Sequence, residues 1–200
     1  MSLHISFGNS KLGKKIWGIN LPAIITFRKN APCAKKCYAR KGRFVFPAVQ
    51  NAHAENLMEY MTDPAAYEAG VAKAAAKREF FRWHSSGDIV DMAYLEMMCR
   101  IAEACQNTRF LCFTKQYEIV NEYLDHHTCP KNLVLVFSQW GIFMPYNPHN
   151  LPIAAIKFRK GESNIPEGAH HCPKYCGDCV YSGCSCWDLK PGEAVYFDEH

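Results

Sequence analysis

Cysteine thiols in two separated groups are the residues of this chain whose type and spacing could do chemistry. Cys33 and Cys37 form the first group, and the tail adds Cys172, Cys176, Cys179, Cys184 and Cys186 within one short segment. Thiolates two to four residues apart on a loop can converge on a single metal ion or cluster. The spacing therefore predicts a soft-metal site with these seven cysteines as candidate ligands.

A disulfide framework is the alternative use of so many cysteines, and it is disfavoured. Such frameworks belong mainly to small secreted domains that cannot build a core, whereas this chain has 200 residues of which 48% are hydrophobic. The count of eleven cysteines is odd, so they cannot all pair within the chain. The opening residues carry no signal-peptide pattern. A reducing, cytoplasmic setting is expected.

Composition predicts one domain that does not enter a membrane, because no apolar run approaches a membrane span. The net charge of +4 is mild, and part of the basic excess lies in short clusters such as Lys35-Lys36 and Lys157-Arg159-Lys160. Such clusters can hold nucleic acid, but solvated surface is their commoner role and is the favoured interpretation. A redox partner or a small molecule is the expected partner, and the oligomeric state is left open.

Short apolar runs that alternate with helical stretches predict successive parallel βα units. Helices are expected after Pro47, with a new start at Asp63-Pro64, and along residues 89–105 and 117–126. The expected strands are 23–27, 80–83, 109–113, 133–137, 153–158 and 194–197.

Polar segments follow several of these strands. Because the carboxyl ends of parallel strands gather on one side of a sheet, the side chains there should meet at one mouth. We therefore predict an α/β fold with a partial (β/α) barrel-like parallel sheet over residues 1–160. The cysteine-rich tail, residues 161–200, is expected to close over the strand ends as part of the same compact domain.

The residues at this mouth are candidates for catalysis or cofactor binding. His84, Asp88 and Lys115 could supply proton transfer and fixed charge, and Ser85, Ser86, Gly87 and Trp140 could contact a cofactor. Structural roles compete with these: His84 could brace its turn, and Asp88 could cap the next helix, although Asp91 competes for that role.

The segment Cys33-x3-Cys37-Tyr38-Ala39 resembles part of the radical S-adenosylmethionine signature Cys-x3-Cys-x2-Cys. The third position of the signature is Arg40 in this chain. Ser86-Gly87-Asp88 stands where that superfamily places a segment that holds the methionine amino group. The resemblance implies a cluster-dependent enzyme that binds S-adenosylmethionine.

A wider resemblance, over most of the chain, is to phage proteins of the gene-product-eighty-eight type. It rests on Asn20-Leu21-Pro22, Cys37-Tyr38-Ala39-Arg40-Lys41-Gly42, the segment 82–88, Phe113-Thr114-Lys115, Phe137-Ser138, Cys176-x2-Cys179 and Cys186-Trp187. It implies a phage-encoded iron–sulfur protein, which would act in the host cytoplasm.

The metal and the function stay open among three hypotheses. A 4Fe-4S cluster is favoured over zinc, chiefly through the Cys33-x3-Cys37-Tyr38 context and the phage-family resemblance. The first hypothesis is a redox or electron-transfer protein, and the second is a radical-enzyme relative with S-adenosylmethionine as cofactor. The third is a zinc-stabilised module that contacts nucleic acid or a host protein. Whether the chain is an enzyme is undecided.

Overall fold

A mixed sheet organises the computed structural model, which describes residues 3–27, 31 and 33–199. Within these residues its strand order is β1-β2-β3-β4-β5-β6-β8-β7, and every pairing except that of β1 with β2 is parallel. The α/β class and the parallel sheet are confirmed, and the sheet is open rather than closed into a barrel. The strands are β1 (Ile5–Ser6), β2 (Ile16–Ile19), β3 (Phe80–Trp83), β4 (Arg109–Thr114), β5 (Leu133–Ser138), β6 (Ile153–Lys157), β7 (His170–His171) and β8 (Ala194–Asp198).

Two of the helices begin at an aspartate that caps their first turn. Asp63 accepts a hydrogen bond from the Ala66 backbone (3.0 Å) ahead of Pro64, and Asp91 accepts one from the Tyr94 backbone (2.8 Å). Asp91 rather than Asp88 is thus the cap of α4. The helices are α1 (Ala23–Thr26), α2 (Pro47–Thr62), α3 (Pro64–Ala75), α4 (Met92–Ala104), α5 (Tyr117–His126) and α6 (Cys176–Cys179), with three 3-10 turns at Ala34–Lys36, Tyr38–Arg40 and Gly42–Val45.

The strand predicted over 23–27 is wrong. These residues form α1, which starts directly after Pro22, and the first parallel strand is β2, several residues earlier. The Thr26 backbone and hydroxyl both donate to the Pro22 carbonyl (3.2 and 2.9 Å), which closes a helical turn. The periodicity of so short an apolar run fits a strand and a helical turn equally well. The proline directly before it favours the start of a helix.

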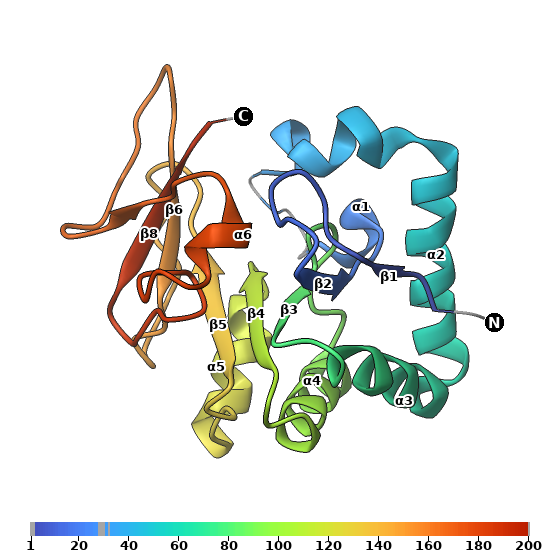
Figure 1. The fold of residues 1–200 in the computed structure, drawn as a ribbon. Coiled ribbons are helices and arrows are strands. Elements are labelled where there is room, and N and C mark those ends of the chain that lie inside the picture. Colours follow the sequence, from blue (N-terminus) through green and yellow to red (C-terminus); the bar gives the residue numbers. More distant parts are fainter. Residues whose placement is uncertain (1–2, 28–30, 32, 200) are drawn as a thin grey trace.

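The two faces of the sheet have different covers. The alternating residues of one face pack against α2, α3, α4 and α5 in a single large core. The opposite face packs against the tail, and Figure 1 shows the tail with α6 crossing that side of the sheet. The residues of this second core are Leu12, Ile16, Phe80, Leu111, Val136, Ala154, Cys172, Cys176, Val180, Trp187, Leu189 and Val195.

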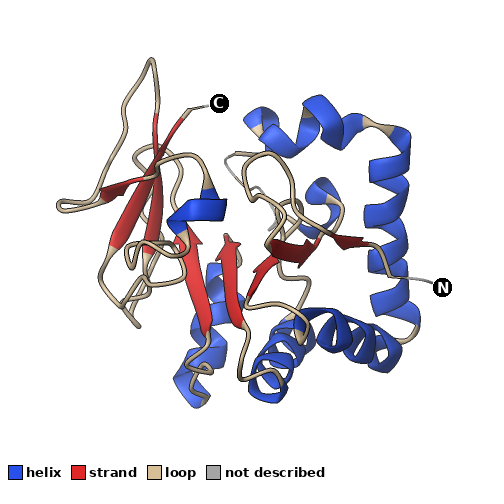
Figure 2. Ribbon diagram, viewed as in Figure 1, coloured by secondary structure: helices blue, strands red, loops and turns tan. Residues whose placement is uncertain are grey.

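The tail also contributes to the sheet. β8 lies between β6 and β7 and is parallel to both, so the last strand of the chain pairs with the strand that precedes the tail. Between β6 and β8 the tail is mostly loop and turn, as Figure 2 shows. None of the helices in the described part of the chain is both long and apolar enough to cross a membrane.

A candidate thiolate metal site

All five tail cysteines line one small pocket on the sheet face that the tail covers. The pocket has a volume of about 30 Å³, and its floor includes Leu111, Phe113 and Val195 of the sheet. The short helix α6 places Cys176 and Cys179 at its two ends, and the Cys176 backbone donates to the Lys11 carbonyl (2.8 Å). The fold therefore brings together the tail cysteines that the spacing singled out: Cys172, Cys176, Cys179, Cys184 and Cys186.

Two buried N–H groups belong to residues of this same pocket and have no hydrogen-bond partner among the described residues. They are Arg82 Nε and Trp187 Nε1. The Arg82 guanidinium stacks over the Phe113 ring at 4.5 Å, so it is held beside the thiols by a cation–π contact. Buried donors without partners cost free energy unless an acceptor reaches them. Thiolate or sulfide sulfur would be such an acceptor.

Burial favours the protonated form of three pocket thiols, those of Cys176, Cys179 and Cys186. Burial raises the pKa values of Cys176 and Cys179, and it raises the pKa of Cys186 to about 12, while the positive charge of Arg82 opposes the shift at Cys176 and Cys186. Thiolates are the metal-binding form, so loading this pocket must release protons. As they stand, no three His, Cys, Asp or Glu side chains among the described residues are arranged to hold a metal ion. Binding would draw the sulfur atoms closer together.

The first cysteine pair does not line this pocket. Cys33 and Cys37 flank the 3-10 turn Ala34–Lys36, and both are buried, but neither lines the pocket of the tail cysteines. Burial raises the pKa of Cys37, and the charges of Lys115 and Arg40 partly oppose this. The charge of Arg82, a residue of the tail-cysteine pocket, acts on the pKa of Tyr38 beside Cys37 as well as on those of Cys176 and Cys186.

The loop after β3 mainly makes structural contacts with the chain segments beside it. The Tyr38 hydroxyl donates to the Ser85 carbonyl (2.6 Å), and the Ser86 hydroxyl donates to the Leu21 carbonyl (3.0 Å). Gly87 has a φ of +90°, and a Cβ there would lie 2.7 Å from the Leu21 side chain. Only glycine suits both the backbone conformation and the space. These residues join the Cys37 loop to β3.

His84 lies in the core on the helix side of the sheet, with 3% of its surface exposed. Its Nε2 is 3.0 Å from the Tyr94 hydroxyl, and its Nδ1 is 3.9 Å from Cys112 Sγ. Burial lowers the pKa of His84 to about 3, and the nearby charge of Arg82 acts in the same direction. The ring is therefore neutral at physiological pH and touches core residues.

Asp88 is a buried junction between three segments. One carboxylate oxygen accepts from the Thr114 hydroxyl (2.6 Å) and the Ile89 backbone (2.8 Å), and the other accepts from the Lys115 backbone (2.9 Å). Its own backbone N–H donates to the Thr26 hydroxyl (2.9 Å). Asp88 thereby ties α1 and the end of β4 to the loop after β3.

Replacing Asp88 with alanine is expected to lower the free energy of unfolding by about 3 kcal/mol, because three donors lose a buried acceptor and each such loss costs about 1–3 kcal/mol before the loop relaxes. Asp88→Asn keeps one oxygen and should lose less. Urea unfolding of both variants measures the difference. An alanine variant as stable as the wild type would show that these bonds do not hold the loop.

The remaining predicted site residues are divided between two places. Lys115 follows β4, where its charge favours the ionised form of both Asp88 and Cys37. Trp140 lies in the connection after β5 and packs edge-to-face on Phe158, with ring centroids 5.1 Å apart. The predicted mouth is therefore partly assembled: the Cys37, Ser85–Asp88 and Lys115 loops meet, and Trp140 packs with the residue after β6.

Arg82 lines the pocket but was not among the predicted site residues. It stands in the apolar strand Phe80-Phe81-Arg82-Trp83, where a lone charge on a sheet with both faces covered needs a partner. This isolated charge is the feature of the sequence from which Arg82 could have been predicted as a site residue. Lys11, another residue of the pocket, comes from the turn before β2, and its sequence context gave no indication of this position.

Fold and site together define an open parallel α/β sheet protein with a cysteine-lined pocket under its tail. A family model described as Gene product 88 matches residues 3–167, and the chain belongs to this family of phage proteins. The matched range includes Cys33, Cys37 and the loop after β3, and it ends before Cys172. No curated protein and no solved structure matched the chain.

Proposed function

We propose that this protein is an iron–sulfur protein whose cluster is held by the tail cysteines and whose role is one-electron transfer. The observation that carries the proposal is the coincidence, in one pocket, of five cysteines and two residues with unpartnered buried N–H groups. Four thiolates complete the coordination of a 4Fe-4S cluster. The fifth cysteine leaves one to spare, and Cys184 is exposed enough to be that one.

The neighbouring side chains suit a negatively charged centre. Arg82 and Lys11 line the pocket and would offset the charge of thiolate ligands. Arg82 Nε and Trp187 Nε1 would donate hydrogen bonds to sulfur, and such bonds tune the reduction potential of a cluster. The cluster would supply reversible one-electron chemistry. This chain's own part is to bind it, to bury it against the sheet and to set its potential.

Zinc is the second candidate, because four of the five pocket cysteines would suffice for a closed tetrahedral site. In that case the metal would stabilise the tail and supply no electron transfer.

Metal and sulfide analysis of anaerobically purified protein separates the two candidates. We expect iron and acid-labile sulfide in equal amounts, with a broad visible absorption that bleaches on reduction and returns on oxidation. The zinc content of the same sample is measured as the control. One zinc per chain without sulfide would contradict the iron–sulfur proposal and establish the zinc site in its place.

A further inference from the structure

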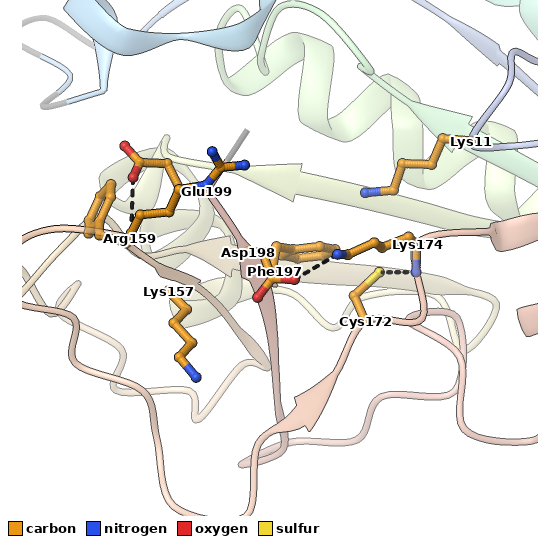
Figure 3. A pocket seen from close by; sticks show the side chains of 9 residues that line it. Lys11, Lys157, Arg159, Cys172, Lys174, Phe197, Asp198 and Glu199 are labelled. Atoms are coloured by element: carbon orange, nitrogen blue, oxygen red, sulfur yellow. Dashed lines mark hydrogen bonds and ion pairs between the residues drawn. The ribbon is translucent and has the colours of Figure 1, made fainter.

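A second and larger cavity adjoins the cysteine pocket. Its volume is about 430 Å³, within the range of small-molecule sites. It shares Lys11, Cys172 and Phe197 with the cysteine pocket but extends away from the remaining tail cysteines. The residues that line it are Lys11, Lys157, Phe158, Arg159, Cys172, Lys174, Phe197, Asp198 and Glu199 (Figure 3).

This cavity lies where other α/β proteins bind their ligands, at one end of the parallel strands. Lys157 ends β6, Asp198 ends β8, and the two residues are register partners in the parallel pair. Cys172 follows β7, which is also parallel to β8. The cavity therefore lies at the carboxyl ends of three parallel strands, where ligands of open parallel sheets characteristically bind.

The charge around the cavity is positive, with four basic residues and two acidic ones. Lys174 Nζ pairs with Asp198 at 2.9 Å, and Glu199 accepts from the Arg159 backbone at 3.1 Å. Among the described residues, no carboxylate pairs with the side chains of Lys11 or Arg159. Lys157 is likewise without a carboxylate partner among these residues, so three of the four basic side chains are left to meet an anionic ligand, with Lys174 beside them.

Aromatic rings supply the apolar part of the cavity. Lys11 Nζ lies 4.7 Å from the centroid of the Phe197 ring, and Figure 3 shows Lys11 projecting toward that ring. Phe158, on the neighbouring strand end, is held by its contact with Trp140. A flat ring could stack on either phenylalanine while its anionic substituent reached the basic side chains.

We propose that this cavity binds a nucleoside phosphate, with the base against Phe197 or Phe158 and the phosphate between Lys11, Arg159 and Lys174. A single nucleotide suits a cavity of about 430 Å³. The site does not depend on the metal proposed for the neighbouring pocket, although their shared residues would let each site sense the other.

Calorimetric titration with ADP, adenosine and inorganic phosphate tests the proposal, on both metal-loaded and chelator-treated protein. We expect saturable ADP binding in both forms, weaker binding of phosphate or adenosine alone, and affinity that falls with salt. The double variant Lys11→Gln/Arg159→Gln should weaken ADP binding about tenfold or more, because it removes two charge-assisted contacts.

Lys131→Gln/Lys190→Gln is the matched control, since it makes the same change in charge at exposed positions before β5 and β8, at the other end of the sheet. It should bind ADP as the wild type does. Phe197→Leu should reduce binding of ADP toward that of inorganic phosphate while leaving phosphate binding unchanged.

Three results would overturn the proposal. They are the absence of saturable ADP binding, equal affinity in the Lys11/Arg159 variant and its control, and tighter binding of a single-stranded oligonucleotide than of ADP. The last result would identify the cavity as a nucleic-acid groove. Because the titration is repeated on chelator-treated protein, each outcome is independent of the iron–sulfur proposal.

Discussion

Serine at both Cys176 and Cys179 is expected to abolish metal binding and to lower the melting temperature by about 10 °C. The double change leaves three thiols in the pocket, one fewer than a closed thiolate site needs. A ligand present at a thousand times its dissociation constant stabilises the folded state by about 4 kcal/mol. In a chain of this length each 1 kcal/mol corresponds to about 2–4 °C.

The loss of stability should be concentrated in the tail. Cys176 packs in the second core with Val180, Trp187 and Leu189, which cover one face of the sheet. Without the metal, these apolar contacts, the pairing of β8 and a few polar contacts such as that of Arg109 with Asp188 (2.6 Å) hold that cover in place. Limited proteolysis of the double variant should therefore cut first between residues 172 and 190, and metal analysis of the same preparation gives the occupancy.

Two control variants make the result specific. Cys105→Ser makes the same atomic change at another buried cysteine, whose Sγ donates to the Ala72 carbonyl at 3.6 Å, and it should retain the metal. Cys33→Ser/Cys37→Ser should also retain it, because neither residue lines the pocket. Full metal content in the Cys176/Cys179 variant would refute the tail site, and loss of metal in the Cys33/Cys37 variant would restore a site shared by both groups.

The parallel strands were predictable because the sheet has covers on both faces. A strand buried on both sides reads as a continuous apolar run, as Leu133–Phe137 does. β2 was missed because Ile16-Trp17-Gly18-Ile19 is short, contains a glycine and follows Lys14 and Lys15. The two-residue strands β1 and β7 have too few side chains to show a pattern.

The grouping of the tail cysteines was predictable from spacing, but their position relative to Cys33 and Cys37 was not. Spacing constrains residues that share one loop, because the chain between them is too short to let them part. The relation between two distant loops depends on which face of the sheet each one crosses. The tail packs on one face, whereas the Cys37 loop is tied to the loop after β3 by the Tyr38 hydroxyl.

The pH dependence of stability should reveal the buried state of His84. The unfolded chain titrates this histidine near pH 6.5, whereas burial lowers its pKa in the folded protein to about 3. Below pH 6.5 the unfolded state therefore takes up a proton that the folded state does not. By linkage, the stability contributed by the neutral ring is complete above pH 6.5 and is lost progressively as the pH falls toward 3.

The size of this loss of stability follows from the pH range between the two pKa values of His84. Each pH unit within it lowers the free energy of unfolding by about 1.4 kcal/mol. Between pH 7 and pH 4.5 the His84 contribution should fall by about 2–3 kcal/mol. Asp88 acts in the opposite direction, because burial raises its pKa and the folded state then gains a proton before the unfolded state does. The wild-type curve alone mixes the two effects.

Comparison with His84→Asn isolates the histidine. His84 has a φ of 54°, and asparagine adopts that conformation more readily than other non-glycine residues. Asp88 titrates in both proteins, so its effect cancels in the difference. Urea unfolding at several pH values should show the advantage of the wild type shrinking as the pH falls. Parallel curves would mean that the ring at position 84 is protonated or exposed to water in the folded protein, which would return His84 to the candidates for proton transfer.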